Sequence, residues 1–336
     1  PSPESCHQIR INYPILDNDE LAKLRDHKDP ALRATTLPTL FAPGTGGAGL
    51  EKAMDELCAR ASAAVEEGYT LLVLSDRRVD ETHAPIPSLL ATAGVHHHLV
   101  REGTRTRCAL IVESGEAREV HHMALLLGYG AGAINPYLAF ETIEELICDG
   151  EIEDIDPPQG IRHLILALTK GVLKVMSKMG ISTLQSYRGA QIFEAVGLEK
   201  SFVDRYFTWT ASRIGGIGID TVADEVRRRH ERAFNARGQT NEELDSGGEY
   251  QWRRDGEYHL FNPDTVYKLQ HATRSGRYDI YREYAQLVND QSRKRATIRG
   301  LFELRPADTP IPLDEVEPVD AILARFSTGA MSYGSI

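Results

Sequence analysis

The chain has 336 residues, 41% of them hydrophobic, which is enough to build a sizeable core in one large α/β domain or in two smaller ones. With 49 acidic and 38 basic residues, the formal net charge is -11, which argues against sequence-independent binding to nucleic acid or to an anionic membrane surface. No apolar run approaches the length of a membrane-spanning helix and the first residues do not resemble a signal peptide, so we expect a cytoplasmic protein without nucleic-acid or membrane partners. Because the chain begins at Pro1 rather than at a methionine, we also expect a fragment.

Cysteines and histidines are the residues most often found in metal sites. The four cysteines are far apart in the sequence, and none has a second cysteine three residues away, so we expect reduced thiols and neither a zinc nor an iron–sulfur site. Consecutive histidines occur at His96-His97-His98 and at His121-His122, but neighbouring side chains on a helix point about 100° apart. We therefore predict no metal site and assign these histidines to packing between helices.

Residues 1–47 are predicted to form an extended lead-in, and a β/α core follows at residues 48–200. In the core, amphipathic helical segments end near glycines and are followed by apolar strands, which is the pattern of βα units and a parallel sheet. The predicted helices span residues 50–65, 88–102 and 117–127, and the predicted strands span residues 70–76, 107–113 and 133–135. Ser88 is expected to cap the second of these helices.

A fourth unit follows in the same core. The apolar spacing over residues 161–179 predicts a helix that ends at Gly180. The β-branched and apolar side chains of residues 181–184 predict a short buried strand. A polar turn at residues 186–189 then leads into a helix that begins near Ile192.

That turn is a candidate anion site formed by Ser186, Arg188 and Gly189. A strand end followed by a helix start exposes free backbone N–H groups, and the helix dipole favours negative charge there. The Arg188 guanidinium suits a phosphate or a carboxylate. The alternative is that Ser186 caps the helix while Arg188 pairs with a neighbouring acidic side chain, and the sequence leaves both interpretations open.

Polar residues follow each predicted strand. In a β/α barrel or an open parallel sheet these strand ends share one edge, which is where active sites lie when such folds have them. The alternative is that these loops are polar because they face solvent. The segments concerned are residues 75–77, 113–115, 135–137 and 185–188. No nucleophile motif or catalytic triad accompanies them, so we assign no catalytic residue.

The regular alternation ends after Gly197, and residues 201–305 are predicted to form a helical and loop extension. Within it the sequence predicts a glycine-rich turn at residues 212–218 and helices at residues 221–236 and 263–291, the last with tyrosines that we expect to pack. Residues 306–336 are a proline- and acid-rich connector that includes a short helix at residues 319–326.

Several long blocks of sequence, in order along the chain, resemble the large subunit of glutamate synthase. They are Ser5–Arg10, His121–Gly130, Ala133–Tyr137, Ser177–Gly189 and Phe326–Ser332. The resemblance implies the central domain of that family, running into the first strand of its FMN-binding barrel at residues 306–336. Together with the βα units it implies an α/β fold, an incomplete β/α barrel-like parallel sheet followed by a mostly helical, irregular segment.

The resemblance also implies a function. In that family a glutaminase domain releases ammonia from glutamine, and the ammonia passes through an internal tunnel to an FMN domain that converts 2-oxoglutarate to glutamate. The central domain joins these two domains of the same polypeptide and helps to form the tunnel. Of the flavin site, only Gly329, Ala330, Met331 and Ser332 can be carried over.

This sequence also departs from the family pattern. It begins at Pro1 rather than at a catalytic cysteine and lacks a cysteine cluster for the family's iron–sulfur centre. We therefore expect the fragment alone to be inactive and to bind no cofactor, while the parent enzyme holds FMN and an iron–sulfur cluster. A small electron-transfer subunit or ferredoxin would be a further partner, and the sequence leaves open whether NADPH, NADH or ferredoxin supplies electrons.

Two other interpretations stay open. One is a stand-alone β/α-barrel enzyme that binds FMN or a phosphorylated ligand at residues 186–189. The other is an independent scaffold with no parent enzyme.

Overall fold

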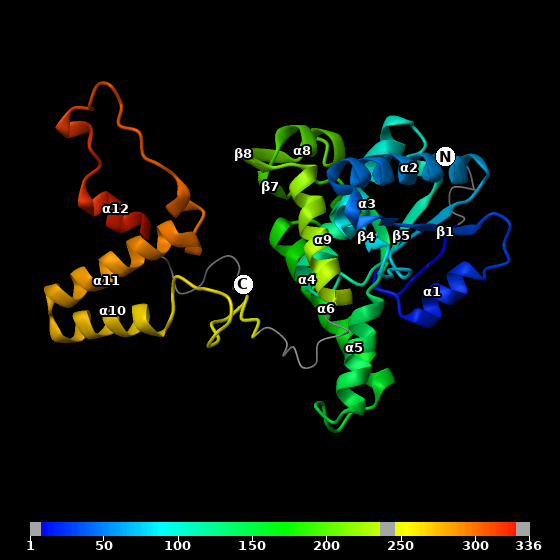
Figure 1. Cartoon of the computed structure of the whole chain (residues 1–336), viewed down its shortest axis with the longest axis horizontal. Helices are drawn as coiled ribbons and strands as arrows, with labels where there is room; N and C mark the ends of the chain where they lie inside the picture. The colour runs from blue at the N-terminus through cyan, green and yellow to red at the C-terminus, as the bar shows by residue number, and fades with distance from the viewer. Residues whose placement is uncertain (1–7, 236–245, 327–336) are drawn as a thin grey trace. The chain divides into compact units, whose positions relative to one another are not determined.

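The computed structural model describes residues 8–235 and 246–326 (Figure 1). Contacts divide the chain into two compact units, residues 1–238 and residues 239–336. Each unit is described by itself below.

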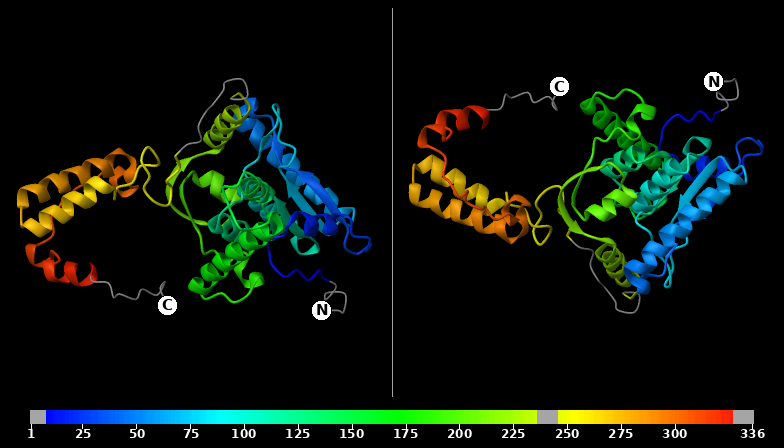
Figure 2. Two further views of the ribbon diagram at one scale, coloured as in Figure 1. Left: turned by 90° about the horizontal axis from the view of Figure 1, so that it is seen from below. Right: turned by 90° about the horizontal axis from the view of Figure 1, so that it is seen from above.

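The first unit is built on a parallel sheet of four strands in the order β1-β3-β5-β6. Figure 1 labels β1 and β5 of this sheet, and Figure 2 shows the same unit from two other sides. Continuous apolar runs form the two central strands, β3 (Leu71–Ser75) and β5 (Ala109–Glu113), because both faces of these strands are covered. The edge strands are β1 (Ala34–Pro38) and β6 (Ala131–Asn135). The sheet is open, so the predicted α/β class with an incomplete barrel-like parallel sheet is confirmed.

Side chains of the strands alternate between two apolar cores. Leu72 and Leu74 of β3 face a core formed with α2 (Gly46–Glu66) and α3 (Ser88–Arg101). Leu71, Val73 and Ile111 face a smaller core with Leu16 and with Leu21 of α1 (Asn18–Arg25). The segment before α1 also protects the free edge of the sheet, because Leu16 donates its N–H to the Ile134 carbonyl of β6 at 2.8 Å.

Helices α4 (Val120–Gly128), α5 (Tyr137–Cys148) and α6 (Pro157–Met179) build a third core beside β6. Helix α6 begins where the Asp156 side chain accepts the N–H of Gln159 at 2.7 Å. It ends at Gly180, whose φ of 69° is left-handed. The predicted helix and its glycine stop are therefore confirmed.

The lead-in contains regular structure that the sequence analysis missed. Helix α1 has a complete capping box, in which Asp17 accepts the N–H of Glu20 and Glu20 accepts that of Asp17. Strand β1 pairs with β3 from Ala34 opposite Leu71 to Pro38 opposite Ser75. The sheet thus has four parallel strands, but its fourth member precedes the core instead of following α6.

The predicted strand at residues 181–184 is wrong. Thr183 accepts the N–H of Ser186 at 3.2 Å and starts the short helix α7 (Leu184–Tyr187). Such a local side-chain to backbone hydrogen bond competes with strand pairing. The predicted helix from Ile192 is also wrong, because residues Glu194–Leu198 form strand β7.

Strand β7 pairs in parallel with β8 (Ala211–Ile217), and α8 (Lys200–Tyr206) connects the two strands. The predicted turn at residues 212–218 is therefore mostly strand. Gly216 fits this strand because a Cβ there would lie 2.2 Å from the Gly197 carbonyl oxygen of β7. Helix α9 (Ile219–Asn235) follows and confirms the predicted charged helix.

The other predicted strands and helices of the core are confirmed, with one change at α3. Pro87 is its N-cap, and Ser88 is the first helical residue, whose N–H donates to Glu116 Oε2 at 2.6 Å. A two-residue antiparallel ladder joins β2 (Leu40–Phe41) and β4 (Ala84–Pro85). Single helical turns of other types lie at Pro43–Thr45, Arg105–Arg107, Ser292–Ala296, Arg299–Leu301 and Leu313–Glu315.

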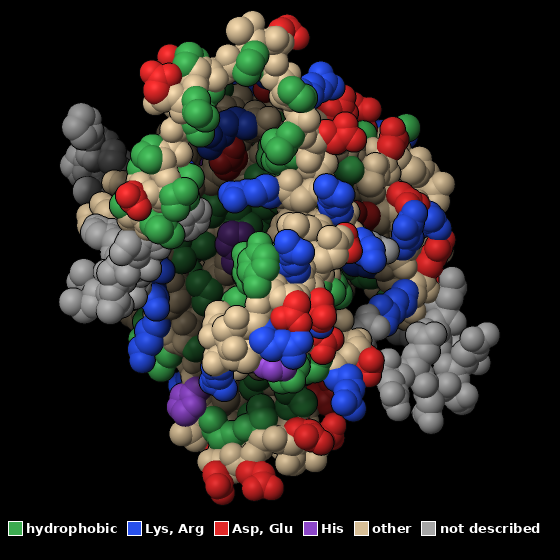
Figure 3. All heavy atoms as spheres, turned by 90° about the vertical axis from the view of Figure 1, so that its left-hand side faces the viewer, with side chains coloured by type: hydrophobic (Ala, Val, Ile, Leu, Met, Phe, Trp, Pro, Cys, Tyr) green, Lys and Arg blue, Asp and Glu red, His purple; other side chains and the backbone are tan. Residues whose placement is uncertain are grey.

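The second unit contains α10 (Pro263–Ser275), α11 (Tyr278–Gln291) and α12 (Val319–Phe326). The helical stretch predicted at residues 263–291 is divided into α10 and α11 by Gly276, whose φ of 66° is left-handed, and the helix predicted at residues 319–326 is confirmed. Of the tyrosines expected to pack, Tyr278 and Tyr281 stack on each other with their ring centres 5.8 Å apart, although both side chains stay exposed. Figure 3 shows hydrophobic side chains interspersed with charged ones on the surface. Within the described residues, no helix has both the length and the apolarity needed to cross a membrane.

Candidate functional site

The carboxyl ends of β3, β5 and β6 meet at one edge of the sheet, as the sequence predicted. Asp76 donates its N–H to the Glu113 carbonyl at 3.2 Å, and Ser114 donates its N–H to the Asn135 carbonyl at 3.0 Å. Residues 75–77, 113–115 and 135–137 therefore lie together. Residues 185–188 do not join them, because no strand of this sheet precedes α7.

Glu113 is the centre of a charged network at this edge. Its side chain is 2% exposed, and it accepts hydrogen bonds from Arg25 Nη1 at 3.1 Å, from Arg77 Nε at 2.9 Å and from the Ser75 hydroxyl. Burial by itself raises the pKa of Glu113, but the hydrogen bonds from Arg25 and Ser75 and the charge of Arg25 outweigh it and lower the pKa. The carboxylate is therefore held ionised.

Asp76 is the second buried carboxylate, at 3% exposure. It accepts the N–H of Gly115 and the hydroxyl of Ser114, each at 3.0 Å, and it also has a hydrogen bond with Tyr137. Burial raises its pKa and the hydrogen bonds only partly oppose that effect. The Arg77 guanidinium lies over the Tyr137 ring, 4.1 Å from its centre, and so links Tyr137 to the Glu113 network.

A cavity of about 600 Å³ opens beside Asp76 and Tyr137. Its apolar wall includes Leu126 of α4 and Val226 of α9, and the exposed Arg229 lies at its border. The cavity lies where open α/β sheets place ligands, beyond the carboxyl ends of the strands.

The Glu113 network offers no free guanidinium to the phosphate of a flavin. Both arginines of the network are already engaged by Glu113, and the Ser114 hydroxyl and Gly115 N–H are engaged by Asp76. The carboxyl edge of this sheet is therefore held together by its own side chains.

The candidate anion residues Ser186, Arg188 and Gly189 do not converge on one point. Ser186 is exposed within α7, Arg188 follows the C-terminal end of that helix, and the Gly189 N–H donates to the Gly128 carbonyl at 2.9 Å. The predicted helix N-terminus is absent at this place, so the structural basis of the prediction is wrong. No carboxylate pairs with Arg188 among the described residues, so the alternative pairing is not found either.

The histidines make structural contacts. Arg105 Nε donates to His96 Nδ1 at 2.9 Å, and His98 Nε2 lies 2.8 Å from the Ser62 hydroxyl. Burial, with the charge of Arg105, lowers the pKa of His96 to about 3. Across residues 8–235 and 246–326, no three side chains of the metal-ligating types gather into a site.

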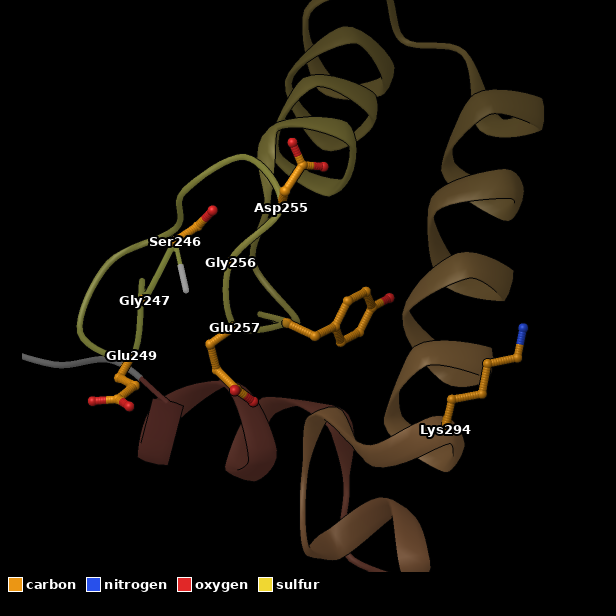
Figure 4. Close-up of a pocket in the computed structure, with 8 residues that line it drawn as sticks. Ser246, Gly247, Glu249, Asp255, Gly256, Glu257 and Lys294 are labelled. Atoms are coloured by element: carbon orange, nitrogen blue, oxygen red, sulfur yellow. The ribbon is translucent and has the colours of Figure 1, made fainter. Parts of the chain in front are cut away.

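A second cavity, of about 770 Å³, lies in the second unit (Figure 4). Glu249, Asp255, Glu257 and Lys294 line it, but their charged groups point in different directions. A ligand site needs groups that converge, so this cavity supplies none.

Sequence reasoning missed Arg25, which lies 88 residues before Glu113 in a segment expected to be extended. No sequence signal connects two residues at that separation. The carried-over flavin residues Gly329, Ala330, Met331 and Ser332 lie outside the described residues.

Comparison with known proteins gives matches over the whole chain. The family model described as glutamate synthase central domain matches residues 1–199, and that described as conserved region in glutamate synthase matches residues 259–336. The glutamate synthase [NADPH] large chain of Bacillus subtilis is 43% identical over 336 residues, covering 100% of this chain and 21% of that protein. The ferredoxin-dependent chloroplastic glutamate synthase of Spinacia oleracea is 38% identical, covering 99% of this chain and 21% of that protein.

Among solved structures, the recombinant flavin-binding domain of baker's yeast flavocytochrome b2 matches with a TM-score of 0.34 and 16% sequence identity. The match covers 52% of this chain and 37% of that chain. A similarity this low supports no inference about this chain. The chain spans about a fifth of the length of the curated relatives named above. With a central-domain match over residues 1–199, the chain belongs to the glutamate synthase family and contains that family's central domain.

Proposed function

We propose that this chain acts as the central domain of a glutamate synthase, an oxidoreductase that converts glutamine, 2-oxoglutarate and a reductant to two molecules of glutamate. The observation that carries the proposal is the match of the central-domain family model over residues 1–199, together with 43% identity to a glutamate synthase large chain across the whole sequence.

Within that enzyme, the domain joins a glutaminase domain to an FMN domain and helps to form the tunnel through which ammonia passes. The engaged polar groups at the sheet edge support this structural role. Glu113 and Asp76 are both buried and hydrogen-bonded within the chain, so they hold strand ends and helices in place instead of presenting a free acid or base.

The proposal extends to cofactors and partners. The parent enzyme holds FMN and an iron–sulfur cluster, the chain alone binds neither, and Gly329, Ala330, Met331 and Ser332 contribute to the flavin site when the FMN domain is complete. The electron donor acts through a small subunit or is ferredoxin, and relatives with NADPH and ferredoxin in their names support both options. We place the enzyme in the cytoplasm.

A chimera tests the proposal. Residues 1–199 would replace the matching segment of the Bacillus subtilis large chain, and glutamate formation would be measured with glutamine and, separately, with added ammonia. We expect both activities to persist, with the glutamine-dependent activity kept because ammonia still reaches the FMN domain. A Glu113→Ala chimera is the control for a misassembled domain.

A second experiment addresses the chain by itself. The 336-residue chain with glutamine, 2-oxoglutarate, a reductant and FMN should neither turn over nor bind FMN stoichiometrically. Turnover at ordinary enzyme rates would instead establish a stand-alone enzyme that binds FMN or a phosphorylated ligand. A folded chimera without glutamine-dependent activity would contradict the channelling role.

A further inference from the structure

The Arg188 guanidinium has one buried nitrogen, and no carboxylate of the described chain forms an ion pair with it. Its Nε has no exposed surface and no hydrogen-bond partner. Burying a charged donor without a partner costs stability, so a guanidinium in this state needs an explanation. The residue as a whole is only half-buried, which leaves the outer part of the guanidinium accessible from solvent.

The Arg188 side chain reaches the start of β6. A Cβ built on Gly132 would lie 3.9 Å from Arg188 Nη2, so the guanidinium lies beside the backbone at this end of the strand. This is the amino-terminal edge of the sheet, opposite the edge that holds Glu113 and Asp76.

A second guanidinium contacts the backbone two residues before Gly132, because Arg105 Nη2 donates to the Gly130 carbonyl. Arg105, in the turn before β5, donates from Nε to His96 Nδ1 at 2.9 Å, from Nη1 to the Cys108 carbonyl at 2.7 Å and from Nη2 to the Gly130 carbonyl at 2.7 Å. None of the three acceptors is charged: two are backbone carbonyls, and the third is His96, whose lowered pKa keeps it neutral. Each terminal nitrogen of Arg105 also carries a second N–H that these bonds do not use.

The electrostatics agree with an unbalanced pair of cations. Burial lowers the pKa of Arg188. Burial also lowers the pKa of Arg105; the neighbouring Cys108 opposes this effect, and the charge of Arg188 adds to it. Among the described residues no carboxylate forms an ion pair with either guanidinium, although the protein as a whole has a net charge of -11.

We propose that Arg188 and Arg105 form an oxyanion site at the amino-terminal edge of the sheet, which takes the phosphate or carboxylate group of a small ligand. Planar guanidinium groups bind such groups with paired N–H donors. The site keeps Arg188 from the sequence-based prediction but replaces Ser186 and Gly189 with Arg105. It goes beyond the role of the central domain and does not depend on it.

Thermal unfolding of the full chain in matched ionic strength tests the proposal. The additives are sodium chloride, inorganic phosphate and succinate, so that a phosphate source and a carboxylate source are distinguished from general salt effects. The variants are Arg188→Gln and, as a matched control, Arg162→Gln on the exposed side of α6. Because Arg188 Nε has no hydrogen-bond partner to lose, we expect the Arg188→Gln chain to stay folded.

We expect the parent chain and Arg188→Gln to exchange their order of melting temperature between chloride and the oxyanions. In chloride, Arg188→Gln should melt above the parent chain, because a partly buried charge without a carboxylate partner is removed. In saturating phosphate or succinate the parent should melt above Arg188→Gln, and the dissociation constant should rise by about tenfold or more in that variant only. The probe that stabilises the parent more strongly identifies the preferred group.

Three results would overturn the proposal. The first is that neither oxyanion stabilises the parent chain in a saturable way, and the second is that the oxyanions stabilise the parent and Arg188→Gln equally. The third is that Arg162→Gln loses as much oxyanion affinity as Arg188→Gln. A lower melting temperature of Arg188→Gln in chloride would also count against it, because that result indicates a purely structural arginine.

Discussion

Arg25 and Glu113 lie 88 residues apart in the sequence, and the Arg25 guanidinium donates to the Glu113 carboxylate, with Nη1 3.1 Å from Oε1. The contact ties α1 to the carboxyl end of β5. Because Arg77 Nε donates to the same carboxylate at 2.9 Å, one buried acid holds two cations from different parts of the first unit.

Replacing Glu113 with alanine should lower the free energy of unfolding. We expect a loss of about 3 kcal/mol, the low end for breaking a buried ion pair, because part of both arginines is exposed and can be solvated. Those exposed fractions are 32% for Arg25 and 37% for Arg77. Urea denaturation measures the loss. In the control Glu56→Ala, whose ion pair with Lys52 is exposed, the change should be under about 0.5 kcal/mol. Equal effects of the two substitutions would contradict the importance of the network.

The stabilising effect of Glu113 should depend on pH. Its pKa is lowered in the folded protein, so the stabilisation is fully present above the ordinary glutamate pKa of 4.5 and is lost as the pH falls through the folded value. The stability difference between the parent chain and Glu113→Gln should therefore be constant from neutral pH down to about pH 4.5 and shrink as the pH falls further, through the pKa of the folded protein. Urea denaturation over a series of pH values would show this, and a difference that does not vary with pH would contradict it.

Gly130 should tolerate alanine poorly for a steric reason. Its φ is +115°, and an added Cβ would lie 2.3 Å from His96 Nδ1. Gly103 has a φ of +70° with nothing within 4 Å of the Cβ position, so it reports backbone strain alone. We expect Gly103→Ala to cost about 1 kcal/mol and Gly130→Ala about 3 kcal/mol, measured by chemical denaturation. Equal costs would show that His96 can move aside.

Tyr187 should contribute through both its ring and its hydroxyl. The side chain is fully buried, and its hydroxyl donates to the Ala124 carbonyl at 3.0 Å. Removing the hydroxyl in Tyr187→Phe should cost about 1 kcal/mol, while Tyr187→Ala should cost about 4 kcal/mol because it also leaves a cavity. The same substitutions at the exposed Tyr267 are the control and should change stability little. A Tyr187→Ala variant as stable as the parent would contradict this packing role.

Local sequence signals predicted the elements whose determinants are local. Helix α6 followed from apolar spacing, and its end followed from Gly180, which adopts the left-handed conformation that glycine permits. Strands β3 and β5 followed from continuous apolar runs between helices, because a strand covered on both faces needs no polar positions.

Predictions failed where pairing with a distant segment decides the structure. The apolar spacing of Ile192, Phe193 and Val196 favours a helix, but residues Glu194–Leu198 form a strand because β8 pairs with them in parallel. Strand β1 contains only five residues between polar segments, and it was missed because its partner β3 lies more than 30 residues further along the chain.

The sequence by itself determined the order of the first three βα units, the helix ends at glycines and the resemblance to the glutamate synthase family, since spacing, backbone freedom and motif order are all local or linear properties. Only the tertiary structure decided that Arg25 and Arg77 neutralise Glu113 while Arg188 has no carboxylate partner among the described residues. The reason is physical: the pairing of a charge depends on which side chains folding brings within a few ångströms, and residues distant in the sequence supply them.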